Sequence, residues 1–272
     1  MAMRCVSRGK SWANNLPADM IRPFVGAIAL IAALLPGAAS SEDVQPSVED
    51  VRRFTEDVVI GPRPGARLVK WRRAPTIRLE TLVAGPRDEK TGWSVPIPTQ
   101  TMPARYMALR RHSKALSALT GMPIRLMPRD IGSGGDIVIT ILPRTLMPAL
   151  SFPGVPERTV GQLMGPSRCF FVIWPTPDWT IKKARIVINS ILEEDHIVHC
   201  LLEELTQSLG LPNDSERLRP SVFNEAFMLR ELSYLDRILV RTVYDPRIHP
   251  GMTLDAFRAV ADGVVGSYMK SE

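Results

Sequence analysis

The stretch that decides the expected fold is HCLLEELTQSLGLPNDS, which covers His199–Ser215. Apolar residues recur in it at helical spacing as far as Gly210, and glycine commonly ends helices. A polar turn follows the glycine. The same apolar spacing continues N-terminally of His199 and predicts a helix over residues 190–210. Ser190 and Glu193 have the spacing of a capping box at its start.

The predicted helix has two chemically different faces, because successive residues turn by about 100°. One stripe collects imidazole, carboxylate and amide groups, from His196, His199, Glu203 and Gln207. The opposite side carries Val198, Leu201, Leu205 and Leu209. We therefore expect the leucine face to pack against a core and the polar face to line a cleft.

The sequence on either side of this helix predicts a mixture of strands and helices. Strands are expected over residues 74–83, 122–129, 134–144, 169–174 and 184–189, and helices over 47–59, 103–121, 232–245 and 254–269. Residues 85–93 read as a turn and 145–168 as a loop. The order of elements predicts an α/β (α+β) fold, in which a twisted mixed sheet packs on the long motif-bearing helix and a smaller helical part follows.

Composition indicates a globular protein, with 45% hydrophobic and 23% charged residues among 272. An apolar run at 24–35 is shorter than the roughly 20 residues that span a membrane, and small residues follow it. The run predicts a signal peptide region over 1–40, cleaved after Ala39 or Ser40, with translation starting at Met20. A retained membrane-facing anchor is the alternative interpretation.

The export prediction also bears on domain organisation, localisation and partners. It indicates a periplasmic or secreted protein with no transmembrane span in the mature chain. Residues 41–65 are expected to be an N-terminal segment and linker, and 66–272 a single domain. Without residues 1–40 the net charge is (34 − 4) − (28 − 1) = +3. Basic clusters at 70–73 and 105–114 lack the pattern of a nucleic-acid module, so no nucleic-acid partner is expected.

Two cysteines, Cys169 and Cys200, remain in the exported chain. An oxidising compartment favours one disulfide between them. Two buried thiols are the alternative, and a catalytic cysteine is a further one that nothing nearby supports. If the bond forms, it would join the floor of the cleft to its rim.

The stretch EELTQSLGLPND resembles the metzincin clan of zinc metalloproteases, whose pattern is H-E-x-x-H-x-x-G-x-x-H followed by a Met-turn. In this resemblance Glu203, Gln207 and Asn213 hold the positions of the metal ligands, and Glu204 holds that of the catalytic base. Asp214 follows directly. The segment PSVFNE resembles the Met-turn through Ser221, Phe223 and Asn224, with Phe223 in place of methionine.

The resemblance covers most of residues 65–248, and it implies a zincin-like fold with an edge strand over the cleft. Taken together, EELTQSLGLPNDS, PSVFN and YDPRIHPGM resemble more closely a bacterial family of exported proteins that carry a domain of unknown function. Membership would make the histidine-free motif a property of the family.

The motif departs from the metzincin pattern at the metal, because no ligand position holds histidine. Zinc prefers imidazole, thiolate and carboxylate, whereas amide oxygens suit hard cations. The donor set therefore admits a divalent metal but does not favour zinc. Three interpretations stay open: a metal-free cleft used for binding, a metal held by His199, Glu203, Gln207 and Asp214, or a plain structural helix.

These observations lead to two expectations for function. The first is a peptidase-like hydrolase with Glu204 as its catalytic group, in which hydrolysis depends on whether a metal is retained. The second is a non-enzymatic envelope protein that holds an extended peptide or protein ligand in the same cleft, against the edge strand.

Overall fold

The computed structural model describes residues 3–4, 45–128, 133–165 and 167–272 of the chain. The apolar run, cleavage site and Met20 of the predicted signal region lie outside the described residues. The elements are β1 Met3–Arg4, α1 Val48–Val59, β2 Thr76–Arg87, β3 Ser94–Thr99, α2 Pro103–Thr120, β4 Arg125–Leu126, β5 Ile137–Leu142, the 3-10 helix η1 Arg144–Ala149, α3 Glu157–Met164, β6 Cys169–Pro175, β7 Ile181–Asn189, α4 Glu194–Gln207, α5 Tyr234–Tyr244 and α6 Leu254–Met269.

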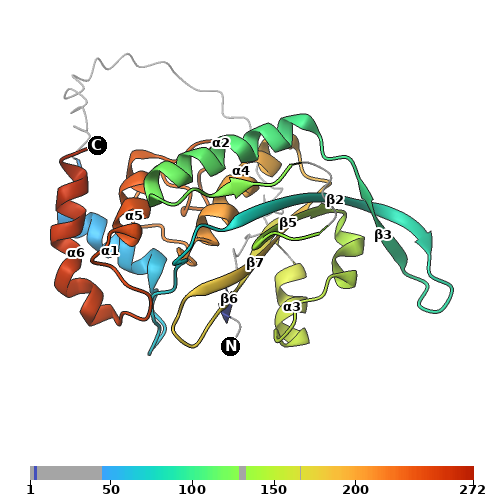
Figure 1. Ribbon diagram of the computed structural model, residues 1–272, viewed down its shortest axis with the longest axis horizontal. Helices are drawn as coiled ribbons and strands as arrows, with labels where there is room; N and C mark the ends of the chain where they lie inside the picture. The colour runs from blue at the N-terminus through green and yellow to red at the C-terminus, as the bar shows by residue number, and fades with distance from the viewer. Residues whose placement is uncertain (1–2, 5–44, 129–132, 166) are drawn as a thin grey trace, which may run out of the picture.

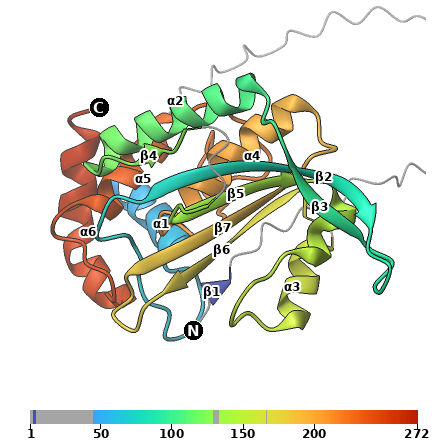
Figure 2. The same cartoon turned by 45° about the vertical axis from the view of Figure 1, so that its right-hand side comes forward.

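A mixed sheet of seven strands forms the centre of the molecule, in the order β1-β6-β7-β5-β2-β3, with β4 also paired to β2. Strands β2, β5 and β7 are parallel neighbours. Strand β6 runs antiparallel to β7, and β3 runs antiparallel to β2. Figures 1 and 2 show the twist of the sheet, with α2 and α4 over one face and α3 on the other. The predicted α+β class, with its mixed sheet and helical C-terminal part, is confirmed.

Each face of the sheet buries its own hydrophobic core. On the helix-covered face, isoleucines of β5 such as Ile137 and Ile139 join the main core, which also takes in the leucines of α4. On the opposite face, Phe170, Val187 and Leu163 form a smaller core beneath η1 and α3. Because alternate strand residues point to opposite faces, one set of strands supplies both cores.

The helices at the two ends of the domain pack on each other. Helix α1 lies in the segment predicted as a linker, yet Val51, Phe54 and Val58 are buried in the main core. It contacts α5 and α6, which form the C-terminal helical part. Among the described residues, no helix is long and apolar enough to cross a membrane.

Two regions differ from the sequence-based expectation. Strand β2 runs three residues into the predicted turn, as far as Arg87, and residues 88–93 then turn the chain. It pairs with β3, which was not predicted because Pro96 and Pro98 hide its strand character; proline is confined to edges of sheets, where β3 lies. The segment 145–168, expected as a loop, carries most of η1 and the eight-residue α3. Helix α3 is stabilised by burial of Leu163 in the smaller core. This tertiary contact cannot be predicted from so short a sequence.

Helix α4 begins later than predicted, and the capping box at Ser190 does not form. The Ser190 amide donates to the Leu142 carbonyl at 2.9 Å, which holds Ser190 at the end of the sheet. The helix therefore starts at Glu194, with no side-chain cap at its N-terminus. Past its C-terminus, Gly210 has φ +105°, and a Cβ there would lie 2.1 Å from the Val69 carbonyl oxygen. Only glycine fits this turn, where the chain crosses another backbone segment.

Candidate functional site

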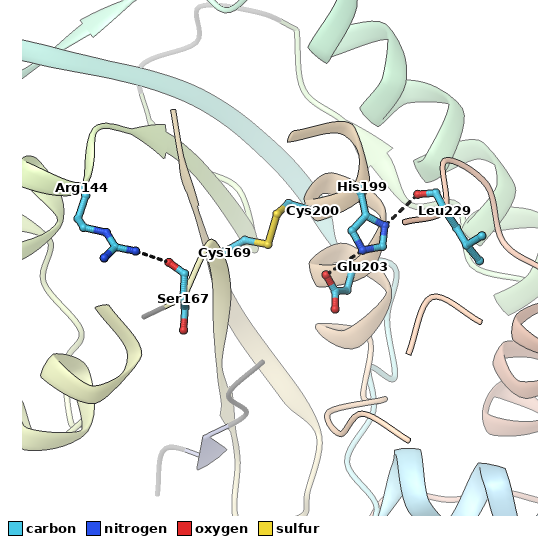
Figure 3. Close-up of a disulfide and its surroundings, with 7 residues drawn as sticks. All are labelled: Arg144, Ser167, Cys169, His199, Cys200, Glu203 and Leu229. Atoms are coloured by element: carbon cyan, nitrogen blue, oxygen red, sulfur yellow. Dashed lines mark hydrogen bonds and ion pairs between the residues drawn. A yellow bond between two sulfur atoms is a disulfide. The ribbon is translucent and has the colours of Figure 1, made fainter. Parts of the chain in front are cut away.

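A disulfide between Cys169 and Cys200 joins the first residue of β6 to helix α4, as predicted (Figure 3). Strand β6 is the antiparallel strand next to the sheet edge; among the residues that the structure describes, the two of β1 pair with its outer side. The bond therefore fixes the start of this strand beside the polar residues of α4. Both cysteines are buried, and the alternative of two buried thiols does not apply because their sulfur atoms are bonded to each other.

His199 and Glu203 face each other one turn apart on α4, with His199 Nε2 3.4 Å from Glu203 Oε2 (Figure 3). His199 Nδ1 donates to the Leu229 carbonyl oxygen at 2.9 Å, and a carbonyl can only accept. Nε2 is therefore the lone-pair nitrogen of a neutral ring. Burial lowers the pKa of His199, while burial followed by the charge of Asp214 raises the pKa of Glu203 well above its usual range.

Glu204 is fully buried, and neither of its carboxyl oxygens has a hydrogen-bond partner among the described residues. Burial is the main cause that raises the pKa of Glu204 well above normal, and the charges of Glu203 and Asp214 add to it. A carboxyl oxygen of Glu203, one of Glu204 and the Cys169 sulfur all lie within 4.8 Å of one another. Glu204 thus packs against the disulfide, where burial favours the uncharged form of its carboxyl group.

Two further residues extend this cluster. Gln207 lies one helical turn after Glu203 on α4, and Asp214 lies on the loop that follows the helix. Gln207 Nε2 donates to Asp214 Oδ1 at 2.6 Å, and Gln207 is buried. Its Oε1 has no partner in the part of the chain that the structure describes. Burial and the charge of Glu225 raise the pKa of Asp214 to about 7, although the hydrogen bond from Gln207 acts in the other direction.

Asn213 does not join the cluster. Its backbone amide and its Nδ2 both donate to the Val58 carbonyl oxygen, each at 3.0 Å. Carbonyls in the last turn of a helix lack partners within the helix, so the end of α1 attracts this asparagine. The proposed ligand set of the resemblance is therefore split: Glu203, Gln207, Asp214 and the adjacent His199 lie together, and Asn213 points to α1.

Zinc does not fit the residues that converge here. The three positions that carry histidine in the metzincin pattern hold a carboxylate, an amide and an amide that is bonded elsewhere. The donors that remain together are oxygen atoms, apart from one imidazole whose free nitrogen faces Glu203. This chemistry is that of hard cations rather than of zinc.

The segment predicted as Met-turn-like supports the loop that carries Asp214. Phe223 is buried and lies edge-on to Phe54 of α1, with ring centroids 6.3 Å apart. Its carbonyl accepts from the Ser215 amide at 2.8 Å. Ser221 Oγ donates to the buried Asp236 at 2.6 Å, and the Asn224 side chain accepts from the amide two residues on. These contacts fix the loop segment next to Asp214.

Two charged residues near the cluster were not singled out from sequence. Glu225 acts on the pKa values of Glu203 and Asp214, and Arg168 lowers the pKa of Glu203. Each adjoins a residue that was singled out, Asn224 and Cys169 respectively. Being next to these two residues was the only sequence feature that could have pointed to them, whereas the fold brings both charges to the same cluster.

Comparison with known proteins gives one family match. A family model described as "Protein of unknown function (DUF2927)" matches residues 53–262, which is well over half of the chain. No curated protein and no solved structure matches the chain.

Proposed function

We propose that this chain, which belongs to the DUF2927 family because that family's model covers most of its length, is an exported zincin-like protein that acts on peptides. Its activity is peptidase-like, and Glu204 is the group that transfers a proton from the attacking water to the leaving nitrogen. One observation carries the proposal. Three carboxyl groups with raised pKa values, the buried Glu203 and Glu204 and the partly buried Asp214, meet near β6, and such clusters concentrate at active sites.

The arrangement of the sheet supports the zincin-like part of the proposal. The motif helix α4 follows β7, and the antiparallel β6 lies beside it near the sheet edge. This resembles the zincin half-domain, in which an edge strand borders the cleft. The outer side of β6 already pairs with another strand, since Ile173 and Val172 oppose Met3 and Arg4. Met3 and Arg4 belong to the predicted signal region, so in the exported protein an extended peptide can take their place by the same backbone hydrogen bonds.

The chemistry that Glu204 contributes is proton transfer. Hydrolysis of a peptide bond requires that a water lose a proton as it attacks the carbonyl carbon, and that the leaving nitrogen gain one. Glu204 in its ionised form accepts the first proton and returns it to the nitrogen. The raised pKa favours the second half of this cycle, because it makes the ionised carboxylate a stronger base that holds the transferred proton more firmly.

A protease screen with the exported chain tests this proposal. Wild type should cleave unfolded protein or peptide libraries, and Glu204→Gln should lose about 100-fold or more of the rate. Glu216→Gln, which removes the same charge from an exposed position on the following loop, is the matched control and should keep its rate. A Glu204→Gln variant as active as the control would refute the assigned role.

A second candidate function is a non-enzymatic protein that binds extended peptides. The observation in its favour is that Asn213 is bonded to α1, so the third ligand position of a protease is not available. In this case neither wild type nor Glu204→Gln cleaves, and both retain immobilised extended peptides equally. Retention that depends on peptide backbone rather than on side chains would identify pairing with β6.

A further inference from the structure

The buried cluster on α4 contains more unsatisfied oxygen atoms than a folded protein normally keeps. Among the described residues, Glu204 Oε1, Glu204 Oε2 and Gln207 Oε1 have no hydrogen-bond partner. Both residues are at least 99% buried. Buried polar groups in proteins are nearly always paired, because an unpaired one loses its hydrogen bonds to water without replacement. Three such atoms in one place call for a partner that hydrogen bonding within the chain does not provide.

The carboxyl groups of Glu203 and Glu204 have the spacing of ligands that share one ion. Calcium binds oxygen at about 2.3–2.6 Å, so two of its ligands are at most about 5 Å apart. A carboxyl oxygen of Glu203 and one of Glu204 lie within 4.8 Å of each other. The Cys169 sulfur also lies within this distance, but its bond to Cys200 removes it as a ligand.

Gln207 links this pair to a third carboxylate. Its Nε2 is committed to Asp214 Oδ1 at 2.6 Å, which leaves Oε1 as the end of the amide that has no partner. The amide is thereby oriented, because reversing it would place its oxygen against the carboxylate. Asp214 also borders an open cavity of about 600 Å³, lined by Asp57, Pro62 and Arg217, which gives it a route to solvent.

From these contacts we infer that Glu203, Glu204 and Gln207 supply oxygen donors to a hard divalent cation, that Asp214 orients the Gln207 amide, and that the cation is calcium. Two charges on the ion offset a concentration of carboxylates that Arg168 opposes only at Glu203. Calcium suits this site better than magnesium, which keeps several waters and demands octahedral geometry. Zinc is disfavoured because this donor set contains neither the imidazole nor the thiolate ligands that zinc sites usually include.

The inference deepens the proposed function without depending on hydrolysis. Glu204 can coordinate through one oxygen and keep the other for the proton that the proposed reaction moves. The cation site rests on the donor atoms alone, so it applies equally to a peptide-binding protein.

Calcium binding to the full exported chain, measured without peptide, tests the inference. Chelator-treated wild type should bind one calcium ion in isothermal titration, and saturating calcium should raise Tm by about 5 °C or more. Magnesium and zinc at the same concentrations should act more weakly. Glu203→Gln and Gln207→Met should weaken calcium binding by about tenfold or more. Glu216→Gln removes an exposed charge on the same loop, and its calcium affinity should match that of wild type.

Folding of the variants is checked by their Tm without calcium. Glu203→Gln removes a buried carboxylate, so its Tm should not fall below that of wild type. Absence of calcium binding to wild type, tighter binding of zinc than of calcium, or equal calcium affinity in Gln207→Met and wild type would each overturn the inference. Calcium binding by a protein that cleaves no peptide would leave the site standing and refute the peptidase. Cleavage that is unaffected by chelation and by Gln207→Met would refute the cation site and leave the peptidase proposal standing.

Discussion

At the scale of single residues, His112 shows how burial sets a pH dependence. It lies on the inner face of α2 with 3% of its surface exposed, and its Nε2 has no partner among the described residues. Burial, followed by the charge of Arg111, lowers the pKa of His112 to about 4, against the opposing hydrogen bond with the Val198 backbone. The folded protein therefore holds a neutral ring, whereas the unfolded chain takes up a proton near pH 6.5.

We predict that this difference destabilises the protein in acid. The contribution of His112 is fully present above pH 6.5 and is lost as the pH falls from 6.5 towards 4, because only the unfolded state binds the proton. Between pH 7.5 and 4.5 the loss amounts to about 2 kcal/mol. Urea unfolding of wild type and His112→Gln at both pH values measures it as a double difference, in which the other titrating groups cancel. A pH dependence that is identical in the two proteins would contradict the assignment.

Gly210 is predicted to be the least replaceable glycine of the site. Alanine there would place its Cβ 2.1 Å from the Val69 carbonyl oxygen, at φ +105°. Gly210→Ala should cost about 3 kcal/mol or more, from backbone strain and displacement of the Val69 segment together. Gly65→Ala is the control, since Gly65 also has positive φ but no atom near the new methyl group. It should cost about 1 kcal/mol in the same urea experiment. Equal costs would show that φ alone matters.

At the scale of elements, the connection between β6 and α4 determines how the candidate site is built. The disulfide closes a segment of 31 residues that includes β7. Because α4 also packs against β6 and β7 through its leucines, the covalent bond and the core act on the same geometry. The polar cluster therefore lies on a rigid part of the fold, as a catalytic or metal site requires.

Removal of this disulfide should lower the free energy of unfolding by about 3–4 kcal/mol, by the loop-entropy relation for a loop of this length. The double variant Cys169→Ala/Cys200→Ala, compared with wild type in thermal and urea unfolding, measures the effect. A reducing agent should lower the stability of wild type and leave the double variant unchanged. Equal sensitivity of both proteins to the reducing agent would contradict the bond.

At the scale of the whole molecule, one sheet carries two cores, and we predict that they unfold together. The strands β5, β6 and β7 contribute residues to both faces, so loss of either core exposes the other. Leu163→Ala, in the smaller core, should cost about 2–5 kcal/mol. Its unfolding should still give one transition by far-ultraviolet circular dichroism and by tryptophan fluorescence, because Trp71 lies in the main core and Trp174 packs against the smaller one. Separate transitions would indicate two independent units.

Local pattern determined a large part of this fold. The apolar strands β5, β6 and β7, the proline start and glycine end of α2 and the two-faced helix α4 all follow from periodicity and capping chemistry, which act over a few residues. The pairing of Cys169 with Cys200 was foreseen from cysteine number and compartment. By contrast, β3 and α3 were missed, because prolines and short length mask elements that tertiary packing stabilises.

The candidate site divides in the same way. The sequence by itself determined that Glu203 and Gln207 share a helix face, because i and i+4 side chains lie one above the other on any α-helix. Only the tertiary structure decided that Asp214 joins them while Asn213 turns to α1, and that Glu204 is fully buried beside the disulfide. The reason is physical: helical spacing acts within one element, whereas burial, and with it the protonation of each carboxyl group, depends on which distant segments pack around it.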